Sequence, residues 1–349
     1  MHGMNDTNAN VRFRRKAVVI YPRLTWSPHH SIGPHQALET NMIATTIDCA
    51  VPRMPGPKWV DVNGARTCYY EAGSGEPVLF IYGGSAGVAE SAECAGTWNL
   101  NLLPLAARFR AIAYDKLGQG YTDNPSRDED YTIGAVVQHA AGFITGLGLP
   151  PVHVVGHSRG GYAATRLTLE RPDLIQSLTI VNSSTLSPGV GTNEVVLAGC
   201  PYAPYSRESA RWIYEHYCFS KASVTDEWVN MVTAIMQQDK YRESVRKMVG
   251  EFLGSKIFLP HLARQKRETL ERIANGYLQR PTQIFWGQDD ATALIERGLE
   301  LFHMIAQHDS RAVFHAINRS GHFPFREQAQ RFNALLISSL DAIAQTGRS

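Results

Sequence analysis

The run Gly156-His157-Ser158-Arg159-Gly160 places a serine between two glycines in the pattern G-x-S-x-G. The residues before it, 152–155, are mostly β-branched and predict a buried strand, and a helical pattern follows the serine. A serine at a sharp turn between strand and helix is lifted above the edge of a sheet, and side chains at the flanking glycine positions would collide with neighbouring elements. We therefore interpret Ser158 as a nucleophile.

A serine hydroxyl needs a base, and the base needs an acid that orients it. Asp290 follows the apolar run IFWG, and His322 lies in the segment INRSGHFPF, just beyond the next apolar run. The ends of parallel strands converge at the edge of a sheet where ligands bind. We predict Ser158, Asp290 and His322 as the catalytic residues. Asp290 is preferred to Asp289 because it lies further into the loop, and His322 to His315 because His315 falls inside a strand pattern.

The oxyanion formed by attack of the serine needs two backbone N–H donors. One is expected from Arg159, at the start of a helix whose positive end favours negative charge. The other is expected from the turn YGGSAG, with Gly84 as first choice and Ser85 as second. This turn lacks the Lys-Ser/Thr ending of a P-loop and the spacing of a dinucleotide fingerprint, so we predict no cofactor.

The elements that must position these residues begin at Lys58. Residues 1–57 lack periodicity and contain clusters such as SPHHSIGPH and VPRMPGP, which predict a loosely ordered N-terminal arm and linker. KWVDVNG and RTCYYEAG predict a hairpin that turns at Asn63-Gly64. The apolar runs PVLFIYGG, RAIAYDKLG, VHVVG and SLTIVNSS predict buried strands that alternate with helices, which is typical of a mostly parallel sheet.

The alternation stops over residues 185–278, where runs such as ESARWIYEHY and DEWVNMVTAIMQQ show helical spacing. The strand pattern then resumes with TQIFWG and RAVFHAI, and the chain ends on a predicted helix, FREQAQRFNALLISSLDAIA. We therefore predict an α/β core formed by residues 58–184 and 279–349, with residues 185–278 inserted as a helical cap.

Composition excludes several classes of protein. Of the 349 residues 44% are hydrophobic and 19% are charged, as is usual for a globular protein, and a formal net charge of +2 without a basic stripe argues against a nucleic-acid partner. Five scattered cysteines without a CxxC pair argue against disulfides and a zinc site, so we predict no bound metal. No apolar run is long enough to span or anchor in a membrane. We expect a cytoplasmic enzyme that acts on a small molecule, with a homodimer as the commonest symmetric assembly.

Together these motifs resemble the α/β-hydrolase superfamily over residues 58–344, and within it the meta-cleavage-product hydrolases of bacterial aromatic degradation. The resemblance is carried by YYEAGSGEPVLFIYGGSAG, YDKLGQGYTDNP, the serine turn, FWGQDD and SGHFPFRE. It implies an α/β-hydrolase fold, with a mostly parallel central sheet flanked by helices and an inserted helical cap. It also implies hydrolysis of a C–C bond in a 2-hydroxy-6-oxo-hexa-2,4-dienoate by the residues predicted above, without a cofactor. A carboxylesterase, lactonase or other acyl hydrolase using the same residues is the alternative.

The sequence departs from that family near the reacting centre. His157 and Arg159 stand where the family has Asn and Met, and Phe323 stands where a Trp commonly follows the catalytic histidine. We therefore regard Ser85, His157 and Phe323 as candidate substrate-binding residues, and we consider the Arg159 guanidinium as an anchor for an acidic substrate. The family's cap arginine, which holds the substrate carboxylate, aligns near Val232.

Overall fold

The computed structural model describes residues 50–188 and 192–346, which belong to a compact unit spanning Asp48–Ser349. Most of the predicted N-terminal arm, residues 1–49, lies outside the described residues. Within residues 50–57, Val51 is buried against the core, and Pro52 O accepts a hydrogen bond from Asn99 Nδ2 at 3.2 Å. The described end of the predicted linker therefore contacts the core.

A single sheet of eight strands forms the centre of the described unit, in the order β1-β2-β4-β3-β5-β6-β7-β8. Two neighbouring pairs, β1 with β2 and β2 with β4, are antiparallel, and every other neighbouring pair is parallel. The strands are β1 (Lys58–Val62), β2 (Ala65–Ala72), β3 (Pro77–Ile81), β4 (Arg110–Tyr114), β5 (Val152–His157), β6 (Ile175–Val181), β7 (Thr282–Gly287) and β8 (Val313–Ile317). The predictions of a mostly parallel sheet and of each strand are confirmed.

The first two strands form the predicted hairpin. Val62 pairs with Ala65, and the two residues between them, Asn63 and Gly64, have φ angles of 54° and 86°. A two-residue turn with positive φ at both positions matches the right-handed twist of its strands, and Asn-Gly adopts it at low cost.

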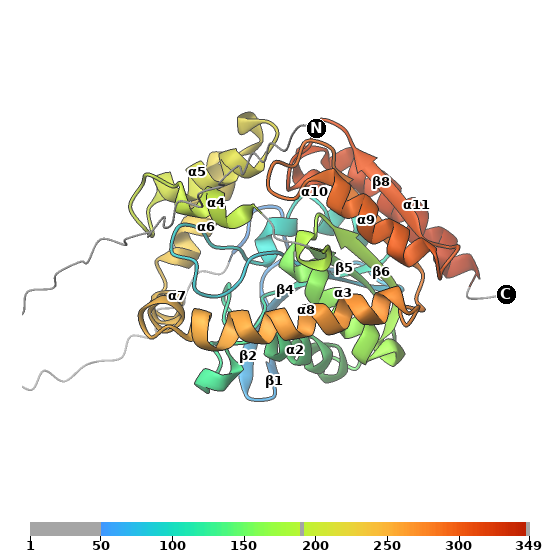
Figure 1. Ribbon diagram of the computed structural model, residues 1–349, viewed down its shortest axis with the longest axis horizontal. Helices are drawn as coiled ribbons and strands as arrows, with labels where there is room; N and C mark the ends of the chain where they lie inside the picture. Colours follow the sequence, from blue (N-terminus) through green and yellow to red (C-terminus); the bar gives the residue numbers. More distant parts are fainter. Residues whose placement is uncertain (1–49, 189–191, 347–349) are drawn as a thin grey trace, which may run out of the picture. The chain divides into compact units, whose positions relative to one another are not determined.

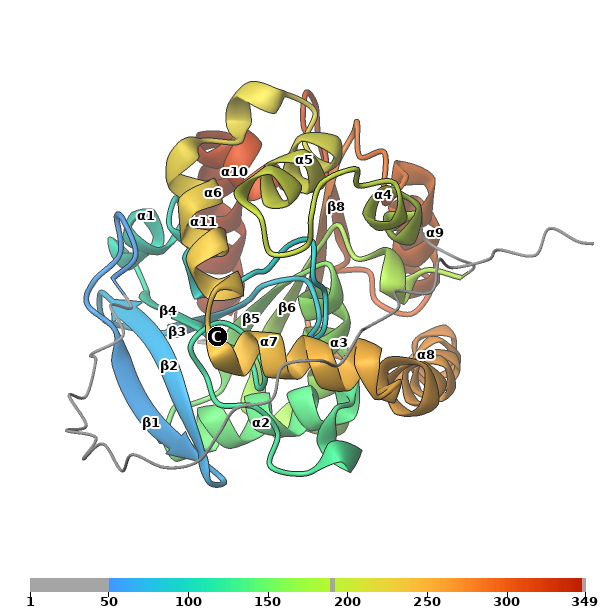
Figure 2. The ribbon, with the colours of Figure 1, turned by 90° about the vertical axis from the view of Figure 1, so that its left-hand side faces the viewer.

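Helices cover both faces of the sheet because its central strands are apolar on both sides. In β3, Val78 and Phe80 pack in one buried cluster with α1 and α11, whereas Leu79 and Ile81 pack in another with α2 and α3. Figure 2 shows α1 and α11 above the strands and α2 and α3 below them. The α-helices that lie outside the segment between β6 and β7 are α1 (Leu102–Ala106), α2 (Ile133–Gly146), α3 (Arg159–Glu170), α9 (Ile295–Ala306), α10 (Pro324–Glu327) and α11 (Ala329–Thr346).

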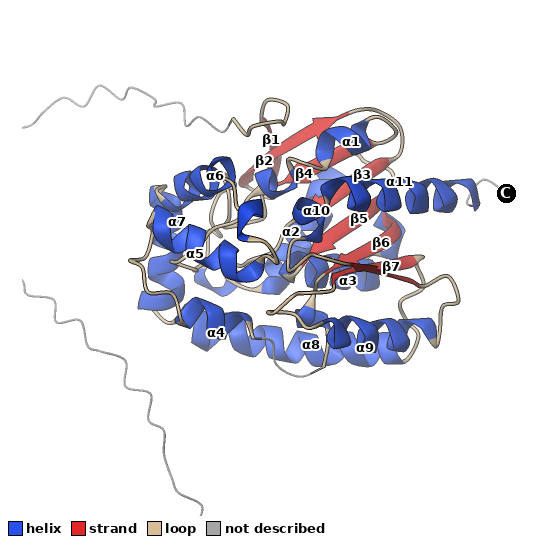
Figure 3. Cartoon of the chain, turned by 90° about the horizontal axis from the view of Figure 1, so that it is seen from above, coloured by secondary structure: helices blue, strands red, loops and turns tan. Residues whose placement is uncertain are grey.

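The described residues between β6 and β7 form helices and no strand, as predicted. They are α4 (Asn193–Ala198), α5 (Arg207–Tyr217), α6 (Asp226–Met236), α7 (Asp239–Val245) and α8 (Leu259–Ala274). Figures 1 and 3 show α4 to α7 gathered beyond one end of the strands. The long helix α8 instead packs along α2 and α3, where Tyr162 Oη lies 3.2 Å from Thr269 Oγ1. The division into core and cap at residues 185 and 278 remains a prediction.

Candidate active site

Ser158 is the single residue between β5 and α3. Its backbone has φ 52° and ψ −123°, a region that residues other than glycine rarely adopt, and its N–H donates to Val181 O at 2.8 Å. A Cβ atom on Gly156 would lie 2.4 Å from Gly160 O, and one on Gly160 would lie 2.3 Å from Ile81 O. The two glycines of the motif therefore allow β5, α3 and β3 to approach closely enough to form this turn.

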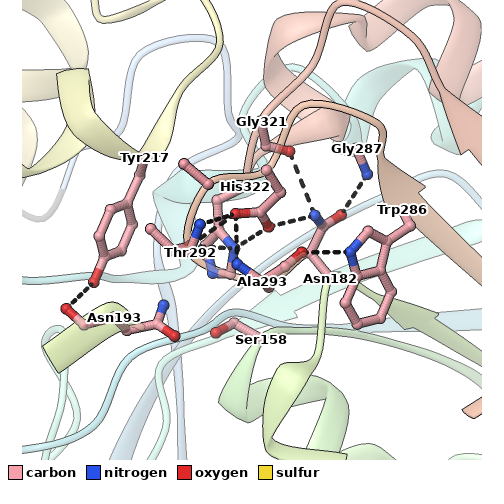
Figure 4. Close-up of polar contacts among 12 residues, drawn as sticks. Ser158, Asn182, Asn193, Tyr217, Trp286, Gly287, Thr292, Ala293, Gly321 and His322 are labelled. Carbon is pink, nitrogen blue, oxygen red and sulfur yellow. Dashed lines mark hydrogen bonds and ion pairs between the residues drawn. The ribbon is translucent and has the colours of Figure 1, made fainter. Parts of the chain in front are cut away.

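Asp290 and His322 form a buried pair, each 2% exposed, in which His322 Nδ1 lies 2.7 Å from Asp290 Oδ2. Asp290 Oδ2 also accepts a hydrogen bond from Asn182 Nδ2 at 2.7 Å. Asp290 Oδ1 accepts three more, each at 2.8 Å, from the N–H and hydroxyl of Thr292 and the N–H of Ala293 (Figure 4). In all these contacts the oxygens of Asp290 are the acceptors. Together the donors hold the carboxylate in one orientation, and the carboxylate holds the His322 ring.

The two partners shift each other's pKa values in opposite directions. Burial alone would raise the pKa of Asp290, but the charge of His322 and the hydrogen bonds from His322, Asn182 and Ala293 hold it below its ordinary value. Burial would lower the pKa of His322, but the charge and hydrogen bond of Asp290, together with the charges of Glu93 and Glu327, hold that pKa above its ordinary value. The pair thus combines an ionised carboxylate with an imidazole of increased basicity, which suits a proton acceptor.

Ser158 and His322 line one cavity of about 260 Å³, together with Gly84, Ser85 and Arg159. Ser158 follows β5 and His322 follows β8, so the cavity lies at the carboxyl ends of parallel strands. Figure 4 draws no hydrogen bond between Ser158 and His322, and such bonds often form only when a substrate is bound. The structure thus brings five of the predicted site residues to one cavity, and Asp290 lies directly behind it.

A larger cavity, of about 1150 Å³, lies elsewhere. Its lining includes Pro77, Ile175 and Thr282, which are the first residues of β3, β6 and β7. It is therefore at the amino ends of the strands, opposite the edge at which open α/β sheets bind their ligands, and far from Ser158.

The glycine-rich turn after β3 packs directly against the serine. A Cβ atom on Gly83 would lie 2.9 Å from Ser158 Cβ, and Gly84 has a φ of 64°, which favours glycine. The Arg159 guanidinium crosses to this turn and donates a hydrogen bond to Ser85 Oγ. The candidate oxyanion donors Gly84 and Arg159 thus line the same cavity as the candidate nucleophile.

His157 and Phe323, two of the candidate substrate-binding residues, lie behind the cavity wall. Both are completely buried, and neither lines the cavity. His157 Nε2 lies 2.9 Å from His322 O, and the Phe323 ring packs edge-on against Trp228 at 5.0 Å. Burial lowers the pKa of His157 well below its ordinary value, so its ring is neutral. These residues support the backbone of His322, whereas Ser85 does reach the cavity.

Comparison with known proteins identifies the family. The model of the alpha/beta hydrolase family matches residues 78–335. The chain belongs to this family. It is 28% identical to a 2-hydroxymuconate semialdehyde hydrolase of Pseudomonas sp. (strain CF600) over 80% of this chain and 93% of that protein. It is 37% identical to a 2-hydroxy-6-oxo-6-(2'-aminophenyl)hexa-2,4-dienoic acid hydrolase of Metapseudomonas resinovorans over 37% of this chain and 43% of that protein.

Solved structures agree with this assignment. A meta-cleavage product hydrolase from Pseudomonas fluorescens IP01 is 26% identical, with a TM-score of 0.68 over 83% of this chain and 98% of that chain. An epoxide hydrolase with 17% identity and a TM-score of 0.60 shares the fold. The resemblance to α/β-hydrolases and to meta-cleavage-product hydrolases within them is therefore confirmed.

In this α/β-hydrolase, sequence reasoning missed three charged residues at the site. Glu93 and Lys266 line the cavity, and Lys116 lies behind its glycine-rich turn. Glu93 Oε2 is buried without a hydrogen-bond partner among the described residues, and burial raises the pKa of this carboxyl group. Glu93 lies in an irregular segment, where no periodicity could place it. Lys116 lies two residues beyond a buried strand, and a lysine in that position was the available signal.

Residues 50–188 and 192–346 contain no group of three His, Cys, Asp or Glu side chains arranged to hold a metal ion. In the same part of the chain no helix is both long and apolar enough to cross a membrane.

Proposed function

We propose that this α/β-hydrolase uses Ser158, His322 and Asp290 to cleave a C–C bond in a 2-hydroxy-6-oxo-hexa-2,4-dienoate produced by aromatic ring fission. The observation that carries the proposal is the buried Asp290–His322 pair, which meets Ser158 at one cavity. The substrate class is supported by two of the hydrolases to which the chain is similar in sequence, one named for 2-hydroxymuconate semialdehyde and the other for a 2-hydroxy-6-oxo-hexa-2,4-dienoic acid.

In the proposed reaction, the dienol first takes its keto form, and Ser158 Oγ attacks the distal carbonyl carbon while His322 accepts the hydroxyl proton. Collapse of the tetrahedral intermediate breaks the bond to the neighbouring carbon. The electron pair of that bond moves through the conjugated chain to the oxygen on carbon 2, which becomes a hydroxyl group by taking the proton that His322 accepted from Ser158. Water, deprotonated by His322, then releases the acyl group from Ser158 as a carboxylic acid. One water is consumed, and the products are this acid and a hydroxydienoate.

Each supporting group has a definite position in this scheme. Asp290 keeps the proton of the neutral His322 ring on Nδ1, which leaves Nε2 free to accept from Ser158, and stabilises the imidazolium that forms. The N–H groups of Gly84 and Arg159 would bind the oxyanion. The side chains of Arg159 and Lys266 are the cations that line the cavity, and they suit the carboxylate of a dienoate substrate.

A second candidate, hydrolysis of an ester or lactone by the same residues, is favoured by one observation. The position at which the resemblance predicts the carboxylate-binding cap arginine is near Val232, and this side chain is buried and packed in the core. If Arg159 and Lys266 do not replace that arginine, the described lining of the cavity contains no other lysine or arginine to bind an acidic substrate, and a neutral ester fits it better.

The test is to generate several coloured ring-fission products with an extradiol dioxygenase and to follow the loss of their visible absorbance. The wild type should bleach at least one of them rapidly, and Ser158→Ala should lose about 10⁶-fold in turnover. Ser126→Ala, at an exposed serine, is the matched control and should behave as the wild type. If the protein bleaches none of these products but hydrolyses a nitrophenyl ester through Ser158, C–C hydrolysis is rejected and hydrolysis of an ester or lactone becomes the proposed function.

A further inference from the structure

Lys116 is a buried cation whose position no part of the proposed reaction explains. It is 1% exposed and lies two residues beyond the end of β4. Its backbone N–H donates to Tyr82 Oη at 3.1 Å, and its Nζ lies 4.6 Å from the centre of the Tyr82 ring. Burying an ammonium group is costly unless its protons are bound and its charge is balanced, so its surroundings indicate what it does.

The ammonium group binds the backbone of the glycine-rich turn. Lys116 Nζ donates to Gly83 O at 2.6 Å and to Gly84 O at 3.0 Å. The Gly83 carbonyl belongs to the same peptide group as the Gly84 N–H, and the Gly84 carbonyl to the same peptide group as the Ser85 N–H. Lys116 therefore binds the carbonyl end of the two peptide groups whose N–H groups, Gly84 first and Ser85 second, were the predicted choices for the oxyanion donor from this turn.

A cation at the carbonyl oxygen of a peptide group strengthens its N–H as a donor. It draws electron density toward the oxygen, which increases the positive charge on the amide hydrogen, and this polarisation is strong where water is excluded. The two charge-assisted hydrogen bonds also hold the carbonyl groups in place, so both N–H groups keep one direction. Both effects matter most when negative charge develops on the oxygen of the substrate.

Glu93 is the acidic group that this ammonium can balance. It lines the same cavity, and its carboxyl group accepts a hydrogen bond from the Gly83 N–H. When ionised, it would oppose a second negative charge on the substrate, and the Lys116 ammonium beside the same turn offsets it. The other charged groups that act on Lys116 are Asp115, which favours its ammonium form, and Arg159, which opposes it.

We propose that Lys116 is a positioning residue that polarises and orients the Gly84 and Ser85 peptide groups as oxyanion donors. This inference rests on the proposed function of Ser158. Burial lowers the pKa of Lys116 to about 7, against the opposing effect of Glu93. The proposed role therefore has a signature, because the rate should fall as pH rises through the Lys116 pKa and the ammonium loses its charge.

The test compares Lys116→Met and Lys116→Arg with the wild type in hydrolysis of a nitrophenyl ester over a range of pH. Lys116→Met should lower kcat by about 10- to 100-fold, less than the ~10²–10³ lost with a direct donor, while KM stays nearly constant. Its affinity for a boronic acid that forms a tetrahedral adduct with Ser158 should fall by a similar factor. Lys116→Arg should recover part of kcat and lose the alkaline fall in rate, because a guanidinium stays charged.

Glu93→Gln provides an independent variant if Lys116→Met does not fold. Removing the carboxylate that favours the ammonium should move the alkaline fall in rate to lower pH. The inference is overturned if Lys116→Met keeps the kcat and boronic acid affinity of the wild type, or if the alkaline limb is the same in wild type, Lys116→Arg and Glu93→Gln. Ester hydrolysis that survives in Ser158→Ala would instead contradict the proposed function, and with it this inference.

Discussion

At the scale of single residues, the two oxygens of Asp290 have different partners. Oδ1 accepts three hydrogen bonds, whereas Oδ2 faces His322 Nδ1 and Asn182 Nδ2. In Asp290→Asn the remaining side-chain oxygen should take the place of Oδ1, because that position receives three hydrogen-bond donors. The new NH2 group then takes the place of Oδ2 and faces His322. Nδ1 must then accept, the ring proton moves to Nε2, and His322 can no longer accept from Ser158. We expect kcat to fall by about 10⁴-fold with little change in KM.

The control for this variant is the neighbouring carboxylate. Asp289 is exposed, so Asp289→Asn should keep the kcat of the wild type in the same steady-state assay. Equal losses in the two variants, or none in Asp290→Asn, would show that Asp290 does not orient the base.

The raised pKa of His322 predicts how the rate depends on pH. Burial lowers this pKa, but Asp290, Glu93 and Glu327 together raise it by more, so His322 becomes protonated at a pH above its ordinary value of 6.5. Protonated His322 cannot accept the proton of Ser158, so kcat/KM should fall as pH falls, with an apparent pKa above 6.5 in the wild type. In Asp290→Asn this acid limb should move to lower pH. A pH profile of ester hydrolysis measures both, and an acid limb below 6.5 in the wild type would contradict the proposal.

At the scale of elements, the glycine after Arg159 controls how closely α3 approaches β3. A Cβ on Gly160 would lie 2.3 Å from both Ile81 O and Tyr82 O, which are backbone atoms that cannot turn away. We expect Gly160→Ala to lower the free energy of unfolding by about 3 kcal/mol, the upper end for an overpacked site, and to displace the glycine-rich turn. Urea unfolding measures the first effect and ester hydrolysis the second.

Gly146→Ala is the control for that substitution. Gly146 ends α2, and the nearest atom to an added Cβ is Asp61 O at 3.9 Å, so the same change should be neutral or slightly stabilising. If both variants unfold at the same urea concentration as the wild type, the close approach of α3 to β3 at Gly160 does not contribute to the free energy of unfolding.

The sequence predicted most elements because their signals are local. The strand runs, the Asn63-Gly64 turn and the strand–Ser158–helix motif each depend on residues that are adjacent in the chain. The run WNLNLLPLAARF, residues 98–109, has helical spacing, but the helix α1 that forms in it is only five residues long. Asn101, just before α1, is bound through its Nδ2 to Phe325 O and Asn333 Oδ1 in a distant part of the chain. The predicted C-terminal helix is divided into α10 and α11 for a related reason, since Gln328 leaves the helical conformation and donates to Arg319 O. Such tertiary contacts carry no local signal.

At the scale of the whole described unit, the strand order and the charged groups at the cavity were beyond sequence reasoning. The alternation of strands and helices along the chain predicted that most strands pair in parallel. Nothing in the sequence placed β4 between β2 and β3 in the sheet. Ser158, Asp290 and His322 could be selected because each follows a strand. Glu93 and Lys266 could not, because their positions depend on how separate segments meet. Lys116 also lies just beyond a strand, but only the fold shows that its ammonium group contacts the turn after β3.

The last prediction concerns a contact that joins distant segments around His322. Glu327 in α10 accepts three hydrogen bonds from backbone N–H groups. Its Oε1 accepts one from Gly321 at 2.8 Å, and its Oε2 accepts one from Phe219 at 2.7 Å and one from Ser220 at 3.3 Å, two residues that lie just beyond α5. Glu327→Ala would leave these amides without an acceptor, and each such loss costs about 1–3 kcal/mol where the group is buried. We expect a lower free energy of unfolding and, because Gly321 adjoins His322, a lower kcat. Glu129→Ala, at an exposed position, should change neither quantity. A Glu327→Ala variant that unfolds and turns over like the wild type would show that the helices between β6 and β7 do not support the position of His322.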